Sequence, residues 1–135
     1  EWAEIYKQNP GNHIVQTFEQ RAGEYPDKEN LMYVRGSAGF AGFAKGGYDP
    51  ARLEKFHEIM QEIHGVRWKE WGTEQIASNF VAANSPDGLA LPHPKYSTYT
   101  GGALPEPSSL IHFIGTYRFK DGIFSGLCNR EISQF

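Results

Sequence analysis

Cysteine is almost absent from this chain, since Cys128 is the only one in 135 residues. An intramolecular disulfide is therefore excluded, and so is a structural zinc site built from several thiolates. A reducing compartment suits such a chain best, so we expect a cytoplasmic location. The chain opens Glu1-Trp2-Ala3-Glu4, without the basic start and apolar run of a secretory signal. A Golgi or secretory lumen is the alternative, if a leader or an anchor has been removed.

Long apolar runs and an excess of positive charge are also missing. No apolar stretch approaches the roughly 18 residues of a membrane-spanning helix, so no span is expected. The chain has 13 Lys and Arg against 16 Asp and Glu, giving a net charge of −3, and no basic run. Binding to nucleic acid by neutralising phosphates is therefore not expected. Apolar residues make up 39% of the chain, enough for the core of a single domain over residues 1–135.

Several short motifs of metal and phosphate chemistry are lacking as well. The sequence contains neither His-x-x-x-His nor Asp-x-Asp. The histidines at 57 and 64 would lie two helical turns apart, too far to bind one metal ion together. No Gly-Lys-Ser/Thr ending of a P-loop occurs either. Any site must therefore be assembled from more widely spaced residues.

Helix signals are clear in three places. Within residues 1–25, Asn12 can cap a helix that places Ile14, Val15, Phe18 and Ala22 on one apolar face. Tyr25-Pro26-Asp27 then ends this helix. The strongest helix follows Asp49 as N-cap, has Pro50 at its first position and stops at Gly65. The residues expected to face the core there are Leu53, Phe56, Met60 and Ile63.

A further helix is predicted from Thr73, as N-cap, to about Asn84, followed by a turn at residues 85–88. Ile76, Ala77, Phe80 and Val81 are expected to face inward along it. Strands are predicted at 31–35, 89–91 and 110–114, with an exposed loop over 97–109. Residues 116–119 are expected to prolong the last strand, before a short helix or tail. The fold class predicted is therefore mixed α/β.

The first candidate site segment runs from Gly36 to Gly47 and is crowded with small residues. Glycine allows a backbone to approach a ligand closely. No helix starts where a dinucleotide-binding fingerprint would need one. A loop that simply needs tight turns and close packing is the structural alternative.

The second candidate is Trp71-Gly72-Thr73-Glu74-Gln75. Glu74 and Gln75 fall in the first turn of the predicted helix, where the helix dipole favours a carboxylate. A carboxylate and an amide beside the indole of Trp71 suit a sugar, because hydroxyls need polar partners and the apolar ring face needs an aromatic platform. Simple capping of the helix by Thr73 and Glu74 is the alternative.

The third candidate is His112, which is flanked by Ile111 and Phe113 in an apolar strand. An imidazole in such a place is either a hydrogen-bonded core residue or a metal ligand. Gly115 allows a bend, and Arg118 beyond it could place a guanidinium on a diphosphate. The three residues together are typical of a corner that binds a metal ion and a diphosphate.

These segments, in this order, resemble the second half of GT-A fold glycosyltransferases, above all the glycogenin-like galactosyltransferase group. The resemblance covers residues 31–119. It includes the strand and small-residue segment, the helix 49–64, and the tryptophan with an acidic residue and a glutamine. It ends with Leu91-Pro92, Lys95-Tyr96 and the His-Phe-x-Gly segment at 112–115.

The resemblance implies a partial GT-A fold and metal-dependent hexosyl transfer from a nucleotide sugar, with UDP-hexose favoured, to an acceptor. His112 would be a ligand of Mn²⁺ or Mg²⁺, and Gly115 and Arg118 would contact the diphosphate. Glu74 and Gln75 would be catalytic residues at the sugar, and Gly36, Ser37 and Trp71 would bind substrate. The family's Asp-x-Asp and its N-terminal nucleotide-binding half are missing from residues 1–135. We therefore expect a fragment of a larger transferase, inactive alone.

The sequence also departs from the family in three places within the matched region. Arg35 or Gly36 replaces the usual asparagine, Glu74 the usual aspartate and Arg118 the usual lysine. A non-catalytic carbohydrate- or protein-binding module that uses its many aromatic residues is the alternative function. A hydrolase acting through Glu74 is a third interpretation, but no second carboxylate can be named for it.

Overall fold

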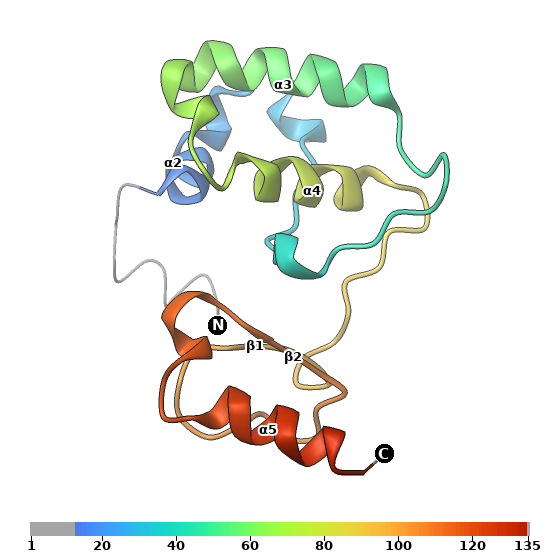
Figure 1. Cartoon of the computed structure of the whole chain (residues 1–135). Helices are drawn as coiled ribbons and strands as arrows, with labels where there is room; N and C mark the ends of the chain where they lie inside the picture. Colours follow the sequence, from blue (N-terminus) through green and yellow to red (C-terminus); the bar gives the residue numbers. More distant parts are fainter. Residues whose placement is uncertain (1–12, 135) are drawn as a thin grey trace. The chain divides into compact units, whose positions relative to one another are not determined.

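The computed structural model describes residues 13–134 (Figure 1), and the chain divides into two compact units, 1–89 and 90–135. Each unit is described by itself. The first contains helices α2 (Ile14–Arg21), α3 (Pro50–His64) and α4 (Thr73–Asn84), and the second contains strands β1 (Tyr96–Tyr99) and β2 (Leu110–Phe113) and helix α5 (Ile123–Ile132). The predicted mixed α/β class is therefore confirmed. Among residues 13–134, no helix has the length and apolar character needed to cross a bilayer.

Helix α2 begins just after His13, whose Nδ1 accepts a hydrogen bond from the backbone N–H of Val15 at 3.3 Å. The imidazole thus satisfies one of the backbone donors at the start of the helix. The predicted cap, Asn12, lies outside the described residues. A 3-10 turn over Ala22–Glu24 follows α2, so the predicted helix ends about one turn early. Its apolar face is confirmed, because Ile14, Val15 and Phe18 are buried.

Helix α3 has the caps that its sequence predicts. The Asp49 carboxylate accepts from the N–H groups of Ala51 at 2.9 Å and Arg52 at 3.3 Å, and Pro50 occupies the first turn. Gly65 follows the helix with a φ of 58°, a conformation that favours glycine. The inward stripe is also confirmed: Phe56 and Met60 are buried and Leu53 and Ile63 are partly buried.

Helix α4 begins at Thr73, but the prediction that Thr73 is its N-cap is wrong. Gly72 holds the cap position with a φ of 107°, where a side chain would meet the His13 ring at 2.6 Å. Thr73 is the first helical residue, and its hydroxyl donates to the Glu70 carbonyl at 3.2 Å. The predicted end at Asn84 is confirmed, and the Gly88 N–H closes the following turn on the Ser85 carbonyl at 3.0 Å.

The core of the first unit is built around Phe56. Its ring stacks on Phe80 of α4, with ring centres 3.9 Å apart and planes 7° from parallel, and it meets Phe18 and Trp68 edge to face. Three helices and the 3-10 turn Gly65–Lys69 therefore meet at one aromatic cluster. In Figure 1, α3 lies along α4, which is the arrangement that this stacking requires.

Two of the three predicted strands are wrong. Leu31–Arg35 and Leu89–Leu91 form no strand in the described part of the chain. Residues 31–37 have the β-favouring side chains of a strand, but a strand also needs a neighbouring chain with which to form a hydrogen-bonded ladder. Here the segment passes beside α4, and helix side chains take the place of that ladder.

The second unit is organised by a parallel pair of strands. Tyr96 pairs with Leu110 and Tyr99 with Phe113 in an unbroken register. The rings of Tyr99 and Phe113 are buried at its end, 5.0 Å apart. The predicted loop over 97–109 is therefore wrong for residues 97–99, which belong to β1. Serine and threonine at 97, 98 and 100 suggested a loop, yet threonine and tyrosine are good strand residues.

The end of the chain departs from prediction in one element. The strand predicted over 110–114 is confirmed as β2, which stops at Phe113. Residues 116–119 were expected to prolong it but form a 3-10 turn over Gly115–Arg118 instead. Gly115 has a φ of 50°, so the backbone turns sharply there rather than continuing extended. The short terminal helix is confirmed as α5.

Phe56 provides a test of the core. Replacing it with alanine should lower the free energy of unfolding by about 3–5 kcal/mol, since the change removes a fully buried ring and leaves a cavity between α3 and α4. Val66→Ala is the control, because Val66 is 85% exposed in the same unit and its loss should change stability by less than about 0.5 kcal/mol. Urea unfolding followed by tryptophan fluorescence measures both; equal effects would contradict this core.

His64 ends α3 inside the aromatic cluster, with only 7% of its surface exposed. Its ring lies almost parallel to Trp68, with centres 6.0 Å apart, and its Nδ1 is buried with no hydrogen-bond partner among the described residues. Burial lowers the pKa of His64, and the nearby Arg21 and Arg67 lower it further, while Glu24 acts in the opposite direction. The folded unit therefore favours the neutral form of this imidazole over the charged form.

This placement predicts a loss of stability in mild acid. Below the ordinary histidine pKa of 6.5, the unfolded chain takes up a proton that folded His64 resists, so the free energy of unfolding falls as pH drops toward the lowered pKa. Above pH 6.5 the contribution is complete. Denaturant titrations between pH 8 and pH 5 should show this slope in the natural chain and a flatter one in His64→Phe.

His57→Gln is the control for that experiment. His57 is exposed, and its Nδ1 accepts a hydrogen bond from the Trp68 indole at 2.8 Å, a bond that the glutamine carbonyl can also accept. This variant should keep the natural slope. A slope in His64→Phe as steep as that of the natural chain would assign the acid sensitivity to other groups.

Candidate functional site

The first two candidate segments meet in the structure. Gln75, at the start of α4, donates from its side-chain amide to the Gly36 carbonyl at 2.9 Å. Gly36 and Gln75 are 39 residues apart in the sequence, yet they share this contact. Figure 1 shows residues 36–47, in turquoise, passing beside α4.

Ser37 serves the local backbone of the small-residue segment. Its hydroxyl accepts from the Gly39 N–H at 3.2 Å and so caps a 3-10 turn over Ala38–Phe40. The turn presents Phe40 to solvent with about half of its side chain exposed. A substrate-binding role for Ser37 would therefore come in addition to this capping role.

Glu74 lies where the sequence places it, in the first turn of α4. One carboxylate oxygen accepts from the Gly72 N–H at 2.8 Å, which satisfies a backbone donor at the helix start. The negative charge also interacts favourably with the positive end of the helix dipole. A carboxylate can accept several hydrogen bonds, so this one does not exhaust the acceptor capacity of Glu74.

Trp71 stands out from the surface, with 81% of its area exposed. The His13 ring meets it nearly at a right angle, with ring centres 5.4 Å apart and planes at 85°. The indole therefore offers apolar surface to solvent, three residues before Glu74 in the sequence. This is the arrangement that a sugar platform needs, and it contrasts with Trp68, which is buried three residues earlier.

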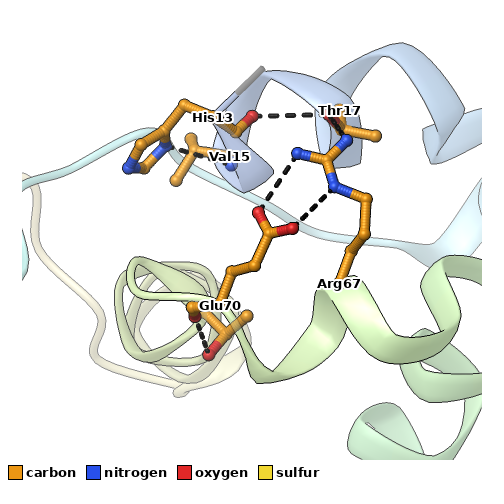
Figure 2. A network of polar contacts seen from close by, with 6 residues as sticks. His13, Val15, Thr17, Arg67 and Glu70 are labelled. Carbon is orange, nitrogen blue, oxygen red and sulfur yellow. Dashed lines mark hydrogen bonds and ion pairs between the residues drawn. The ribbon is translucent and has the colours of Figure 1, made fainter.

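A network of hydrogen bonds holds the backbone of the turn just before Trp71 (Figure 2). Arg67 makes two hydrogen bonds to the Glu70 carboxylate, at 2.9 and 3.1 Å, and a third to the Thr17 hydroxyl at 2.9 Å. Hydrogen bonding to Arg67 lowers the pKa of Glu70 and keeps it charged. The hydroxyl of Thr17 donates in turn to the His13 carbonyl at 3.4 Å. The network thereby ties the turn before α4 to the start of α2.

The third candidate lies in the second unit. His112 pairs with Thr98 in the parallel sheet and is half-buried. Burial lowers the pKa of His112, and the positive charge of Arg118 lowers it further. His112 lies near the end of β2, and Gly115 and Arg118 begin and end the 3-10 turn that follows it. That these three residues form one binding corner stays a prediction.

This corner by itself does not fit a divalent cation. Among residues 13–134, no group of three or more histidine, cysteine, aspartate or glutamate side chains is placed to hold a metal ion. The nearby charge of Arg118 opposes a cation and favours an anion. His112 could supply one ligand, but carboxylates from elsewhere would have to supply the others.

Asn79 is a site residue that the sequence interpretation missed. It is only 5% exposed on α4, and its amide donates to the Gly36 carbonyl and to the Tyr33 hydroxyl, both at 3.3 Å. Its position, four residues after Gln75, puts both amides on one face of the helix. That spacing was a usable signal, but an asparagine within a helix gives no hint of burial by itself.

The search for relatives of this chain gives no further assignment. No known protein family, curated protein or solved structure matches the chain. The functional argument therefore depends on the residues and on their geometry.

The capping role of Glu74 predicts a measurable cost. Glu74→Ala should lower the free energy of unfolding by about 0.5–1 kcal/mol, because the Gly72 N–H loses its acceptor and the helix loses a favourable charge. Glu74→Gln keeps an oxygen acceptor and should lose less. Urea unfolding of the two variants decides the point. If Glu74→Ala is as stable as the natural chain, the carboxylate has no capping role.

Proposed function

We propose that this chain carries the acceptor side and the closing end of a metal-dependent glycosyltransferase, which moves a hexose from a nucleotide sugar to an acceptor. The observation that supports the proposal most is the contact between Gln75 and Gly36. The resemblance assigns both segments to the sugar site of a GT-A fold, and they are neighbours here although they are distant in sequence. UDP-hexose is the favoured donor.

The first unit would supply contacts to sugar. Trp71 presents an exposed indole face for the apolar face of a pyranose ring. Glu74 retains acceptor capacity for sugar hydroxyls beside it, and the donor groups of Gln75 hold the backbone at Gly36. These are binding and orienting roles, and orientation of the two reacting groups is a large part of the rate of a transfer reaction.

The second unit would supply charge for the leaving group. In hexosyl transfer the bond between the anomeric carbon and the diphosphate breaks, a bond to the acceptor oxygen forms, and the acceptor hydroxyl loses its proton. Negative charge then gathers on the departing nucleoside diphosphate, and Arg118 is a cation suited to bind it. A Mn²⁺ or Mg²⁺ ion, when bound by His112 and by carboxylates from a nucleotide-binding half, would neutralise the same charge.

A non-catalytic carbohydrate- or protein-binding module is the second candidate function. The observation that favours it is the exposure of aromatic rings on the first unit: Phe40 is 51% exposed, Phe43 47% and Trp71 81%. Aromatic residues are enriched where proteins recognise partners. Such a module would bind without a metal ion and without a nucleotide.

The test is a calorimetric titration of UDP-glucose with and without Mn²⁺. The titrated protein is the full natural polypeptide that contains residues 1–135. The transferase proposal predicts binding that needs the metal ion and that weakens at least about tenfold in His112→Ala, since loss of one ligand costs that much affinity or more. His93→Ala is the control, because His93 is an exposed histidine of the same unit and should bind like the natural protein.

The other outcomes are equally informative. Binding that is indifferent to Mn²⁺ and to His112 would remove the metal-dependent mechanism and leave His112 as a residue of the sheet. Absence of UDP-glucose binding, together with retention of the protein on a glycan column without metal, would favour the binding module.

A further inference from the structure

The small-residue segment is attached to α4 at both of its ends. At the first end, the Gly36 carbonyl accepts from the side chains of Gln75 and Asn79. At the second end, the Gly47 carbonyl accepts from the Ser85 hydroxyl at 3.0 Å. Residues 37–46 therefore form a loop that leaves and returns to one helix, which is the geometry of a tethered surface loop.

Asn79 stands out among these anchors because it is buried. A buried amide must satisfy its hydrogen bonds within the protein, and both partners of Asn79 lie on the extended segment at Tyr33 and Gly36. Burial raises the pKa of the Tyr33 hydroxyl, so this partner stays neutral and accepts the bond. The segment cannot move from α4 without leaving a buried polar side chain unpaired.

Asn79 also constrains the size of residue 36. A Cβ atom at Gly36 would lie 3.0 Å from the Asn79 side-chain oxygen, closer than ordinary van der Waals contact. The helix therefore reaches the backbone of the segment only because no side chain stands between them. The same asparagine attracts the Gly36 carbonyl and excludes a larger residue.

The loop between the anchors carries the exposed rings. Phe40 lies in the 3-10 turn that Ser37 caps, and Phe43 follows three residues later, each with about half of its side chain in solvent. Small residues surround both, and they cover little of either ring. The two anchors thus hold an aromatic loop on the helix whose first turn carries Glu74 and Gln75.

We infer that Asn79 is a positioning residue: it holds the loop 37–46 in place on α4 through Gly36, with Ser85 as the second anchor. The role in holding the loop is independent of what the protein binds. Its functional meaning rests on the proposed hexosyl transfer, in which this loop lines the acceptor side of the site. Asn79 would then act on the acceptor through the loop and not by contact.

Limited digestion by trypsin at Lys45 tests the inference on the chain itself. Lys45 is exposed within the loop, and trypsin cleaves a segment at a rate that follows the population of its open form. Loss of the buried amide in Asn79→Ala should raise the cleavage rate after Lys45 by roughly five- to tenfold, the effect of one or two hydrogen bonds. Mass spectrometry of the products assigns the cleaved bond.

The control variant Ile76→Val distinguishes a loss of loop positioning from a general loss of stability. This variant trims a fully buried side chain of the same helix without touching a polar anchor. It should lower global stability and leave the rate at Lys45 unchanged at equal temperature. If Asn79→Ala accelerates cleavage no more than Ile76→Val does, the inference is overturned.

The second anchor gives a pair of variants that does not disturb the buried amide. The Ser85 hydroxyl contacts the carbonyls of Gly47 and Val81, whereas the Ser78 hydroxyl contacts the Glu74 carbonyl on the same helix. Ser85→Ala should raise the rate after Lys45 about threefold or more, and Ser78→Ala should not. Equal rates in this pair would also overturn the two-anchor arrangement, even if Asn79→Ala fails to fold.

A double variant tests the contact at residue 36 directly. Gly36→Ala should accelerate cleavage, because its methyl group displaces the Asn79 oxygen. In the Asn79→Ala background the same change has nothing to displace, so it should add little, and the two effects should be far from additive. Additive effects would show that residues 36 and 79 act independently.

The functional half of the inference is read from transfer kinetics in the full natural polypeptide with UDP-glucose and Mn²⁺. Asn79→Ala should raise KM for the acceptor several-fold with a smaller effect on kcat, and the affinity for UDP-glucose should not change. If Asn79 holds the loop in digestion but no transfer or nucleotide binding is found, the proposed function fails while the positioning role stands. If transfer is present and Asn79→Ala leaves its kinetics unchanged, the link between loop and substrate is wrong.

Discussion

The stacking of Phe56 on Phe80 is the contact on which the first unit depends, because it joins α3 to α4 face to face at 3.9 Å. Phe18 from α2 and Trp68 from the intervening turn complete the cluster around the same ring. The three helices are too short to be stable alone, so their mutual burial must hold them. The cluster also contains the side chain of His64, and burial there lowers its pKa. Everything that is proposed about function in this unit requires α4 to stay where Phe80 fixes it.

Helix α4 then uses a second face for a different purpose. Ile76 and Phe80 enter the core, while Gln75, Asn79 and Asn84 donate amide hydrogens to carbonyls of residues 32 and 36. These side chains satisfy the backbone of an extended segment that has no strand beside it in the described structure. The amide side chains on this face of the helix therefore determine the course of the loop. The first turn of the same helix carries Glu74, three residues after the exposed Trp71.

The helices could be predicted from sequence with good accuracy, whereas only one of the three predicted strands, 110–114, forms a strand. Asp49, Pro50 and Gly65 mark the ends of α3 by local backbone chemistry, which needs no knowledge of distant residues. Residues 31–35 have strand-forming side chains, but whether they pair depends on what lies next to them, and here that neighbour is a helix. Residues 96–99 show the reverse case, because the partner strand at 110–113 makes a strand of a segment rich in serine and threonine.

The candidate site, too, could be predicted from the sequence only in part. The sequence by itself determined the residue types and their local settings: small residues at 36–47, Glu74 and Gln75 in the first turn of a helix, and His112 in an apolar strand followed by a glycine bend. Periodicity and capping are local properties, so they can be found in the sequence alone. Only the tertiary structure decided that Gln75 reaches Gly36 and that Asn79 is buried against the same carbonyl. These are contacts between distant residues, and burial sets their strength by removing competing water.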